Sequence, residues 1–204
     1  MKLTPARIVT WAGAAWAGFA LALALSWAPP AAAAPTCWTG YHGQFFTSIQ
    51  YCVTSVRAPE EGATFGPANL ANWDGGTTTT KAWCEGAADF GLGETITIRV
   101  DGGPAFRRIL MANGYAKSPA AYANNARVKT VEVTGDNGLR ATLQFPDRSE
   151  LGHIDLPAKP QRWVQFKIVD VYPGKQAANT CLGFIMPDFE YEEELLMREQ
   201  GLIK

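Results

Sequence analysis

The feature that most limits the fold of this chain is a repeated alternation of apolar and polar residues. Four stretches follow it, at 95–100, 126–133, 140–145 and 163–171. A period of two is typical of half-buried β-strands. The segments 45–53 and 106–111 are weaker candidates for strands. No helix of ordinary length is indicated between residues 35 and 187.

The connections between these strands favour an all-β fold. Asp136, Asn137 and Gly138 lie between the second and third alternating stretches, and these residue types tolerate positive φ, so a hairpin is expected there. Several short strands separated by Gly- and Pro-containing loops indicate a β-sandwich. Its longest loops are expected at 54–94 and 112–126, and loops of that length are usually functional or locally cross-linked.

Residues 1–34 have the organisation of a secretory signal peptide. Lys2 and Arg7 precede a long apolar run that ends in small residues. Cleavage is expected after Ala33 or Ala34. The cut after Ala33 is favoured, because a cut after Ala34 would lie directly before Pro35, and proline disfavours cleavage at that bond. The protein is therefore expected to be exported, either periplasmic or secreted, with no membrane span after cleavage. An uncleaved leader that serves as a membrane anchor is the alternative, because the run is long enough.

The composition of the remaining chain restricts its function. About 170 residues suit one domain with a proper core. Without Lys2 and Arg7, the 18 basic residues become 16, against 19 acidic ones. This slightly acidic balance gives no reason to expect a nucleic-acid partner. No nucleophile elbow, phosphate-binding glycine loop or HExxH helix is present, so no enzyme is expected.

Four cysteines follow the leader, which in an exported chain suggests two disulfides with three possible connectivities. Their spacing does not match a zinc site. They are Cys37, Cys52, Cys84 and Cys181.

The segment 188–204 differs from the rest, because it holds six acidic residues between Asp188 and Glu199. It is expected to form a short helix after Pro187 that ends near Gly201. The residues expected near one face are Tyr191, Leu195 and Leu202. The helix is either a solvated element lying on the domain or a docking segment for a protein partner.

Three segments together resemble a known family. They are "TFGPANLAN" with "KAWCEGAADFGLGETITIRV", "ILMANGYAKSPAAYANNARVKTVEV", and "FKIVDVYPGKQAANTCLGFI". They are similar to the discoidin-like domain at the N-terminus of streptococcal NAD glycohydrolase, which is described as a glycan-binding, translocation-associated module. The resemblance covers about 64–186. It implies a galactose-binding-like jelly-roll β-sandwich of five plus three strands over 35–187, without the glycohydrolase chemistry of a separate domain.

The run 113–129 carries the side chains that a sugar site needs. Amides bind hydroxyl pairs, an aromatic ring faces the C–H side of a sugar, and a cation fixes a hydroxyl or carboxylate. The candidate glycan-binding residues are Asn113, Tyr115, Lys117, Tyr122, Asn125 and Arg127. A structural role is the alternative, above all for Asn113 and Tyr115, since Asn-Gly is a turn dipeptide. Lys117, Tyr122 and Arg127 are the better ligand candidates, because lysine and arginine are rarely buried unpaired.

The resemblance also raises the question of calcium. Related loops often hold a structural calcium ion, and Asp74, Thr80 and Glu85 would supply its oxygen ligands here. The chain departs from the family pattern in the position of Asp74, and Gly183-Phe184-Ile185 replaces the segment that supplies the completing Glu. No cofactor is therefore assigned, and calcium stays an alternative. The alternative role for Glu85 is to accept backbone N–H bonds within its loop.

In the jelly roll that the resemblance implies, the segments of Cys84 and Cys181 are neighbours. The resemblance therefore implies the disulfides Cys84–Cys181 and Cys37–Cys52, with Trp83 in the core. The expected function is an exported, non-catalytic module that recognises a carbohydrate or a cell-surface glycoconjugate. The alternative is a protein-interaction or envelope-scaffold subunit that uses the end loops and the acidic tail.

Overall fold

The computed structural model describes residues 34–72, 80–157 and 159–204, and Ala33–Lys204 form one compact unit. The predicted signal peptide lies outside the described residues. Within the described part of the chain, no helix is both long and apolar enough to cross a membrane.

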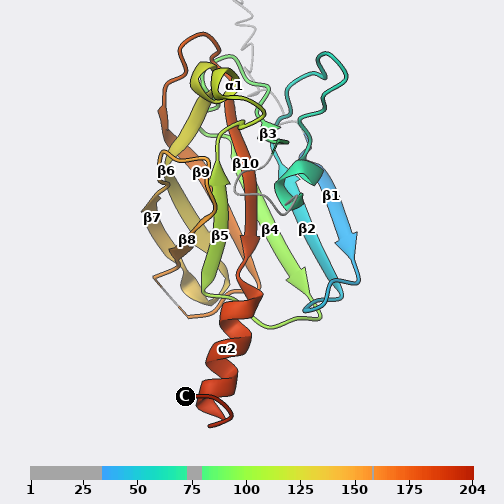
Figure 1. Cartoon of the computed structure of the whole chain (residues 1–204), viewed down its shortest axis with the longest axis vertical. Helices are drawn as coiled ribbons and strands as arrows, with labels where there is room; N and C mark the ends of the chain where they lie inside the picture. Colours follow the sequence, from blue (N-terminus) through green and yellow to red (C-terminus); the bar gives the residue numbers. More distant parts are fainter. Residues whose placement is uncertain (1–33, 73–79, 158) are drawn as a thin grey trace, which may run out of the picture. The chain divides into compact units, whose positions relative to one another are not determined.

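Ten strands carry the fold (Figure 1). They are β1 (Thr36–Tyr41), β2 (Ser48–Val53), β3 (Trp83–Cys84), β4 (Thr95–Asp101), β5 (Arg108–Asn113), β6 (Ala126–Gly135), β7 (Arg140–Gln144), β8 (Gly152–Asp155), β9 (Trp163–Tyr172) and β10 (Thr180–Pro187). The helical elements are the 3-10 turns η1 (Pro67–Ala71) and η2 (Asp136–Gly138), and the α-helices α1 (Pro119–Asn124) and α2 (Phe189–Glu199).

The strands form two layers joined at one short link. One layer contains β1, β2, β4, β9, β6 and β7, and the other contains β3, β10, β5 and β8. The link consists of two parallel residue pairs, Thr180 with Ala126 and Cys181 with Arg127. Figure 1 shows β5 and β10 passing in front of the larger layer. The expected β-sandwich is confirmed, with six and four strands in place of five and three.

The core lies between the two layers, where every second residue of the alternating strands is buried. In β4, Ile96, Ile98 and Val100 are each at most 2% exposed, while Thr97 and Arg99 face outward. Trp83 is fully buried in the same cluster, and its indole N–H donates to the backbone oxygen of Ser55 at 2.9 Å. Removing this apolar surface from water is the main stabilising contribution to such a domain.

Both predicted disulfides are confirmed. Cys37 and Cys52 face each other across β1 and β2, and Cys84 faces Cys181 across β3 and β10. Each pair has its Cα atoms 4.1 Å apart. The second bridge spans 97 residues of sequence, so it restricts the unfolded chain more than the first, which spans 15.

The C-terminal helix α2 is confirmed, and its first residues attach it to the domain. Asp188 caps it by accepting from the backbone N–H of Tyr191 at 3.1 Å, and Gly201 ends it with φ of 71°. Phe189 is 2% exposed and contacts the core, and Glu192 is 7% exposed. Of the three residues expected near one face, Tyr191 and Leu195 are half-buried, and Leu202 is 68% exposed. The first turn is thus the attachment, and the rest of α2 extends away from the end that carries α1 (Figure 1).

Candidate functional site

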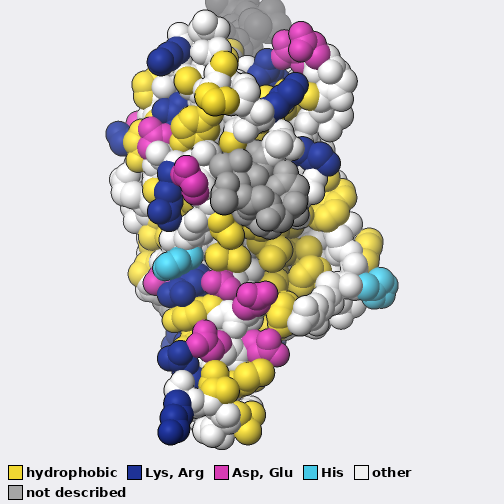
Figure 2. Space-filling view, viewed as in Figure 1, with side chains coloured by type: hydrophobic (Ala, Val, Ile, Leu, Met, Phe, Trp, Pro, Cys, Tyr) yellow, Lys and Arg dark blue, Asp and Glu magenta, His cyan; other side chains and the backbone are white. Residues whose placement is uncertain are grey.

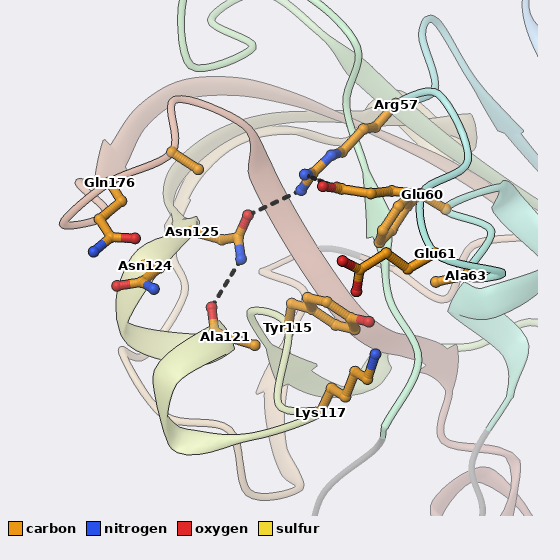
Figure 3. Close-up of a pocket in the computed structure, with 12 residues that line it drawn as sticks. Arg57, Glu60, Glu61, Ala63, Tyr115, Lys117, Ala121, Asn124, Asn125 and Gln176 are labelled. Carbon is orange, nitrogen blue, oxygen red and sulfur yellow. Dashed lines mark hydrogen bonds and ion pairs between the residues drawn. The ribbon is translucent and has the colours of Figure 1, made fainter.

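A pocket opens among three loops at the end of the sandwich opposite α2. Its volume is about 430 Å³, within the usual range for small-molecule sites. The loop after β2, the segment from Tyr115 through α1, and the loop between β9 and β10 form its walls (Figure 3). Its lining residues are Arg57, Glu60, Glu61, Ala63, Phe65, Tyr115, Lys117, Ala121, Asn124, Asn125, Gln176 and Ala177.

A short capped helix shapes one wall of the pocket. Ser118 accepts the backbone N–H of Ala121 at 3.1 Å, and Pro119 occupies the first helical turn, so α1 begins there. Gly114 precedes it with φ of 78°. A Cβ atom at Gly114 would lie 2.6 Å from the ring of Tyr122. Only glycine therefore fits the approach of this loop to α1.

A tight turn forms the opposite wall. Glu60 and Ala63 exchange two backbone hydrogen bonds of 3.1 and 2.8 Å. Glu61 and Gly62 at the tip have φ of 47° and 78°. The left-handed region is uncommon for a residue with a side chain. The turn places the exposed Glu61 carboxylate at the rim of the pocket, as Figure 3 shows.

Arg57 connects the two walls. Its Nη1 donates to Oδ1 of Asn125 at 3.2 Å, and its Nη2 forms an ion pair with Glu60. Its guanidinium carbon lies 4.9 Å from the centre of the Phe65 ring. Asn125 Nδ2 in turn donates to the backbone oxygen of Ala121 at 2.8 Å. The Arg57 side chain therefore links the turn to the C-terminal end of α1.

The floor of the pocket is aromatic and rigid. Tyr115 is 9% exposed, and its ring meets that of Phe65 edge-on at a centroid distance of 5.6 Å. Phe65 and Tyr115 belong to a small buried cluster with Ala82 and the disulfide Cys84–Cys181. The disulfide thus packs beneath the aromatic floor of the pocket. The sequence alone did not predict this contact between the disulfide and the pocket.

Unused polar groups gather around this floor. Five side chains form no hydrogen bond or ion pair with any residue that the structure describes: Glu61, Tyr115, Lys117, Asn124 and Gln176. They provide a carboxylate, a phenol, an ammonium group and two amides on one cavity. This is the combination of donors and acceptors that a polyhydroxylated ligand requires.

Three of the six predicted glycan-binding residues line the pocket, namely Tyr115, Lys117 and Asn125. Asn113 lies in the interior, 1% exposed. Its Nδ2 donates to the backbone oxygens of Val128 at 2.6 Å and Pro146 at 3.0 Å, and its Oδ1 accepts from Val128 N–H at 3.2 Å. The structural alternative holds for Asn113, because its amide binds the backbone of its own domain.

Tyr122 and Arg127 lie on the other side of α1, where they form a network with Asp147. Arg127 is 9% exposed, and it binds both carboxylate oxygens of Asp147, at 2.6 and 3.1 Å. The hydroxyl of Tyr122 donates to the same carboxylate at 2.9 Å. An arginine is rarely buried unpaired, and Asp147 is the partner that makes the burial of Arg127 possible.

The electrostatics of this network are tightly coupled. The hydrogen bond from Arg127 is the main reason that the pKa of Asp147 lies below its usual value. Burial, together with the bond to Asp147, raises the pKa of Tyr122. Both groups therefore keep one protonation state around neutral pH and hold the junction between α1 and β6.

Of the residues considered for calcium, the structure describes Thr80 and Glu85. Asp74 lies outside the described residues, and Thr80 borders a second cavity. Glu85 is fully buried, and its two oxygens accept backbone N–H groups of Thr180 at 2.9 Å and Ala87 at 2.5 Å. Burial raises the pKa of Glu85. The backbone-anchor alternative therefore describes Glu85, and the described chain contains no group of three potential acidic, His or Cys metal ligands.

The pocket also contains residues that the sequence did not single out. Arg57, Glu61 and Phe65 come from the long loop after β2, and Gln176 comes from the loop before β10. For Arg57, Glu61 and Phe65, the feature of the sequence that points to a functional role is the unusual predicted length of the loop 54–94. Nothing in the sequence indicates that Gln176 lies beside α1, since that proximity arises from backbone hydrogen bonds of Gln176 and Ala177 to Asn124, at 3.2 and 2.9 Å.

Comparison with solved structures shows what the fold is similar to. CpGH89CBM32-5 from Clostridium perfringens, solved with GalNAc-β-1,3-galactose, is 12% identical with a TM-score of 0.49, over 67% of this chain and 92% of that one. The family 32 CBM of C. perfringens NanJ, solved with galactose, is 12% identical with a TM-score of 0.46, over 67% and 90%. Arabinofuranosyltransferase AftD from mycobacteria is 15% identical with a TM-score of 0.51, over 74% of this chain and 10% of that one. No curated protein matches.

A β-sandwich with a pocket among its end loops is the architecture of a discoidin-like domain. The sequence model described as the NAD glycohydrolase translocation F5/8 type C domain matches residues 41–188. The chain belongs to that family, which confirms the resemblance in its sequence.

Proposed function

We propose that this protein is an exported, non-catalytic module that binds a glycan in the pocket over Tyr115. The observation that carries the proposal is the gathering of five unused polar side chains around one aromatic-floored cavity of about 430 Å³. Elsewhere the predicted polar residues, such as Asn113 and Arg127, satisfy one another or the backbone. A bound ligand would supply hydrogen-bond partners for the five unused polar side chains, which have none within the described protein.

Each group suits a part of a sugar. The Glu61 carboxylate accepts from hydroxyl groups, and Lys117 donates to ring or hydroxyl oxygens. The amides of Asn124 and Gln176 do both. Because the pocket is open to solvent, we expect a dissociation constant on the order of 10 µM to 1 mM, or about 4–7 kcal/mol.

A glycan array followed by calorimetry tests this proposal. A Lys117→Ala/Gln176→Ala variant removes two exposed pocket groups that hold no internal hydrogen bond in the described chain. A Lys159→Ala/Gln200→Ala variant is the matched control, since both residues are exposed outside the pocket. Galactose and GalNAc-β-1,3-galactose, which appear in the C. perfringens structures, are sensible first ligands.

The expected result is binding by the wild type and the control, with at least a tenfold weaker affinity in the pocket variant. Absence of any bound glycan would refute the function. Equal affinity in all three proteins would refute the site.

The second candidate function is protein interaction through the tail, and one observation favours it. Past the first turn of α2, the tail exposes apolar residues beside acidic ones: Leu196 in the helix is 54% exposed, and Leu202 after it is 68% exposed. Figure 2 shows hydrophobic and acidic side chains together at this end of the molecule. A partner that co-purifies with the protein and is lost when residues 189–204 are deleted would support this function. Retained glycan binding after the same deletion favours the first.

Export rests on the predicted leader, and the two disulfides are consistent with an oxidising compartment. Secretion of a leader fusion into the periplasm or medium is the direct check. A protein that stays in the cytoplasm with reduced cysteines would contradict it.

A further inference from the structure

The pocket does not end at Tyr115. A second cavity of about 170 Å³ adjoins it, and the two share Ala63 and Tyr115 as lining residues. The second cavity is otherwise lined by Gly62, Thr64, Asn69, Thr80 and Lys81. Together the two cavities form a groove that crosses Tyr115.

One wall of the second cavity, at Thr64 and Asn69, is held in place by hydrogen bonds to the backbone. Asn69 Nδ2 donates to the backbone oxygens of Thr64 at 2.6 Å and Ala82 at 2.8 Å. Thr64 is exposed, and its side chain makes no hydrogen bond within the described chain. A cavity with fixed walls costs little ordering entropy when a ligand enters.

The boundary between the cavities is itself a binding group. Figure 3 shows the Tyr115 ring lying across the pocket with its hydroxyl toward Ala63, the other residue that both cavities share. The Phe65 ring fixes Tyr115 from below at 5.6 Å. The hydroxyl has no hydrogen-bond partner in the described chain, so it is available to a ligand that passes from one cavity to the other.

We infer that the groove takes a glycan of at least two linked sugar rings, one in each cavity, with the Tyr115 hydroxyl at the linkage between them. This inference rests on the proposed function and narrows its ligand class from a single sugar to an oligosaccharide. A monosaccharide fills only the larger cavity, which carries Lys117 and Gln176. A disaccharide uses both cavities without further ordering of the protein, and we expect it to bind about tenfold more tightly.

Calorimetry with matched sugar pairs tests the inference on the full-length exported protein. The pairs are galactose with lactose, N-acetylgalactosamine with GalNAc-β-1,3-galactose, N-acetylglucosamine with chitobiose, and mannose with α-1,2-mannobiose. A Thr64→Arg variant fills the second cavity. Thr142→Arg, at an exposed position on β7, is the matched control.

The expected result is that at least one disaccharide binds about tenfold more tightly than its monosaccharide. Thr64→Arg should remove that advantage and leave monosaccharide affinity unchanged, and Thr142→Arg should do neither. If a monosaccharide binds as tightly as its disaccharide, or if Thr64→Arg preserves the difference, the inference is overturned while the proposed function stands. If neither this panel nor the glycan array yields a bound sugar, both the inference and the proposed function fail.

Discussion

Arg57 donates to the side-chain oxygen of Asn125 across 3.2 Å, although the two residues are 68 positions apart in the sequence. The bond joins the turn after β2 to the end of α1, and these are the two walls of the pocket. Pre-organised walls favour binding, because the ligand need not order them. The shape of the site therefore depends on a contact between loops.

A double-mutant cycle measures this contact. Arg57→Ala and Asn125→Ala should each lower the free energy of unfolding by about 1 kcal/mol, since each removes hydrogen bonds at a partly buried site. The double variant should lose less than the sum, by about 0.5 kcal/mol or more, because the two residues share one bond. Urea denaturation gives these values. Glu60→Ala is the control, as its exposed ion pair with Arg57 should contribute little. Strict additivity would show that the two walls are independent.

Two asparagines of the same region should behave in opposite ways. Asn113→Ala leaves buried backbone groups of Val128 and Pro146 without partners, so we expect a loss of about 2–4 kcal/mol in unfolding free energy. Asn124→Ala removes an amide that faces the pocket and holds no hydrogen bond in the described chain, so stability should change by less than about 0.5 kcal/mol. Glycan affinity should fall only for Asn124→Ala. A stable Asn113→Ala protein would contradict the assignment of Asn113 as structural.

The network of Asp147 should make stability depend on acidity. Arg127, and then Tyr122, lower the pKa of Asp147 in the folded protein. A carboxyl group with a depressed folded pKa stabilises the protein above its unfolded pKa of about 3.9, and this contribution is lost as the pH falls through the folded value. Asp147→Asn should therefore be less stable than the wild type at pH 6, and the difference should shrink below about pH 4.

The urea midpoint between pH 7 and pH 2 checks this dependence. Asp89→Asn, which alters an exposed carboxyl group outside the network, is the control. A difference between wild type and Asp147→Asn that stays constant down to pH 2 would show that the carboxylate charge contributes nothing.

The attachment of α2 should depend on its first residue. The Phe189 ring lies 5.9 Å from that of Phe45 and 5.4 Å from that of Phe46. Phe189→Ala should cost about 3–5 kcal/mol, as for other buried aromatic side chains. Leu196→Ala, on the exposed part of the helix, should cost less than about 0.5 kcal/mol. Thermal unfolding of the two variants measures the contrast, and equal losses would place the anchor elsewhere.

Strands with one buried and one exposed face could be predicted from the sequence, because their residues alternate between apolar and polar. Strands that are buried or exposed on both faces could not. In β4 the residues alternate between core and solvent, so the sequence carries the pattern. Strand β10 is buried at seven of its eight positions, so it shows no alternation and was found only through the family resemblance. Strand β1 is partly exposed along its length, and its pairing is visible only once Cys37 is known to face Cys52.

Only half of the predicted glycan-binding residues line the pocket. The reason is that residue type does not show whether the polar groups of a side chain already have hydrogen-bond partners within the protein. Tyr115 and Lys117 were expected to bind a ligand, and both line the pocket. Arg127 has the same chemistry as a ligand-binding arginine, but Asp147, 20 positions later, occupies its guanidinium. Arg57 and Gln176 reach the site through tertiary pairing, which a single sequence does not contain.

The measurement that tests the central claim most directly is the mapping of a bound glycan by amide and side-chain NMR shifts. The ligand is the tightest glycan from the array, titrated into isotopically labelled protein. We predict shift changes concentrated at Glu61, Tyr115, Lys117 and Gln176, with those of Arg127 and the exposed turns of α2 small. Shift changes confined to α2 or to the outer face of β6 and β7, with the pocket unaffected, would contradict the account.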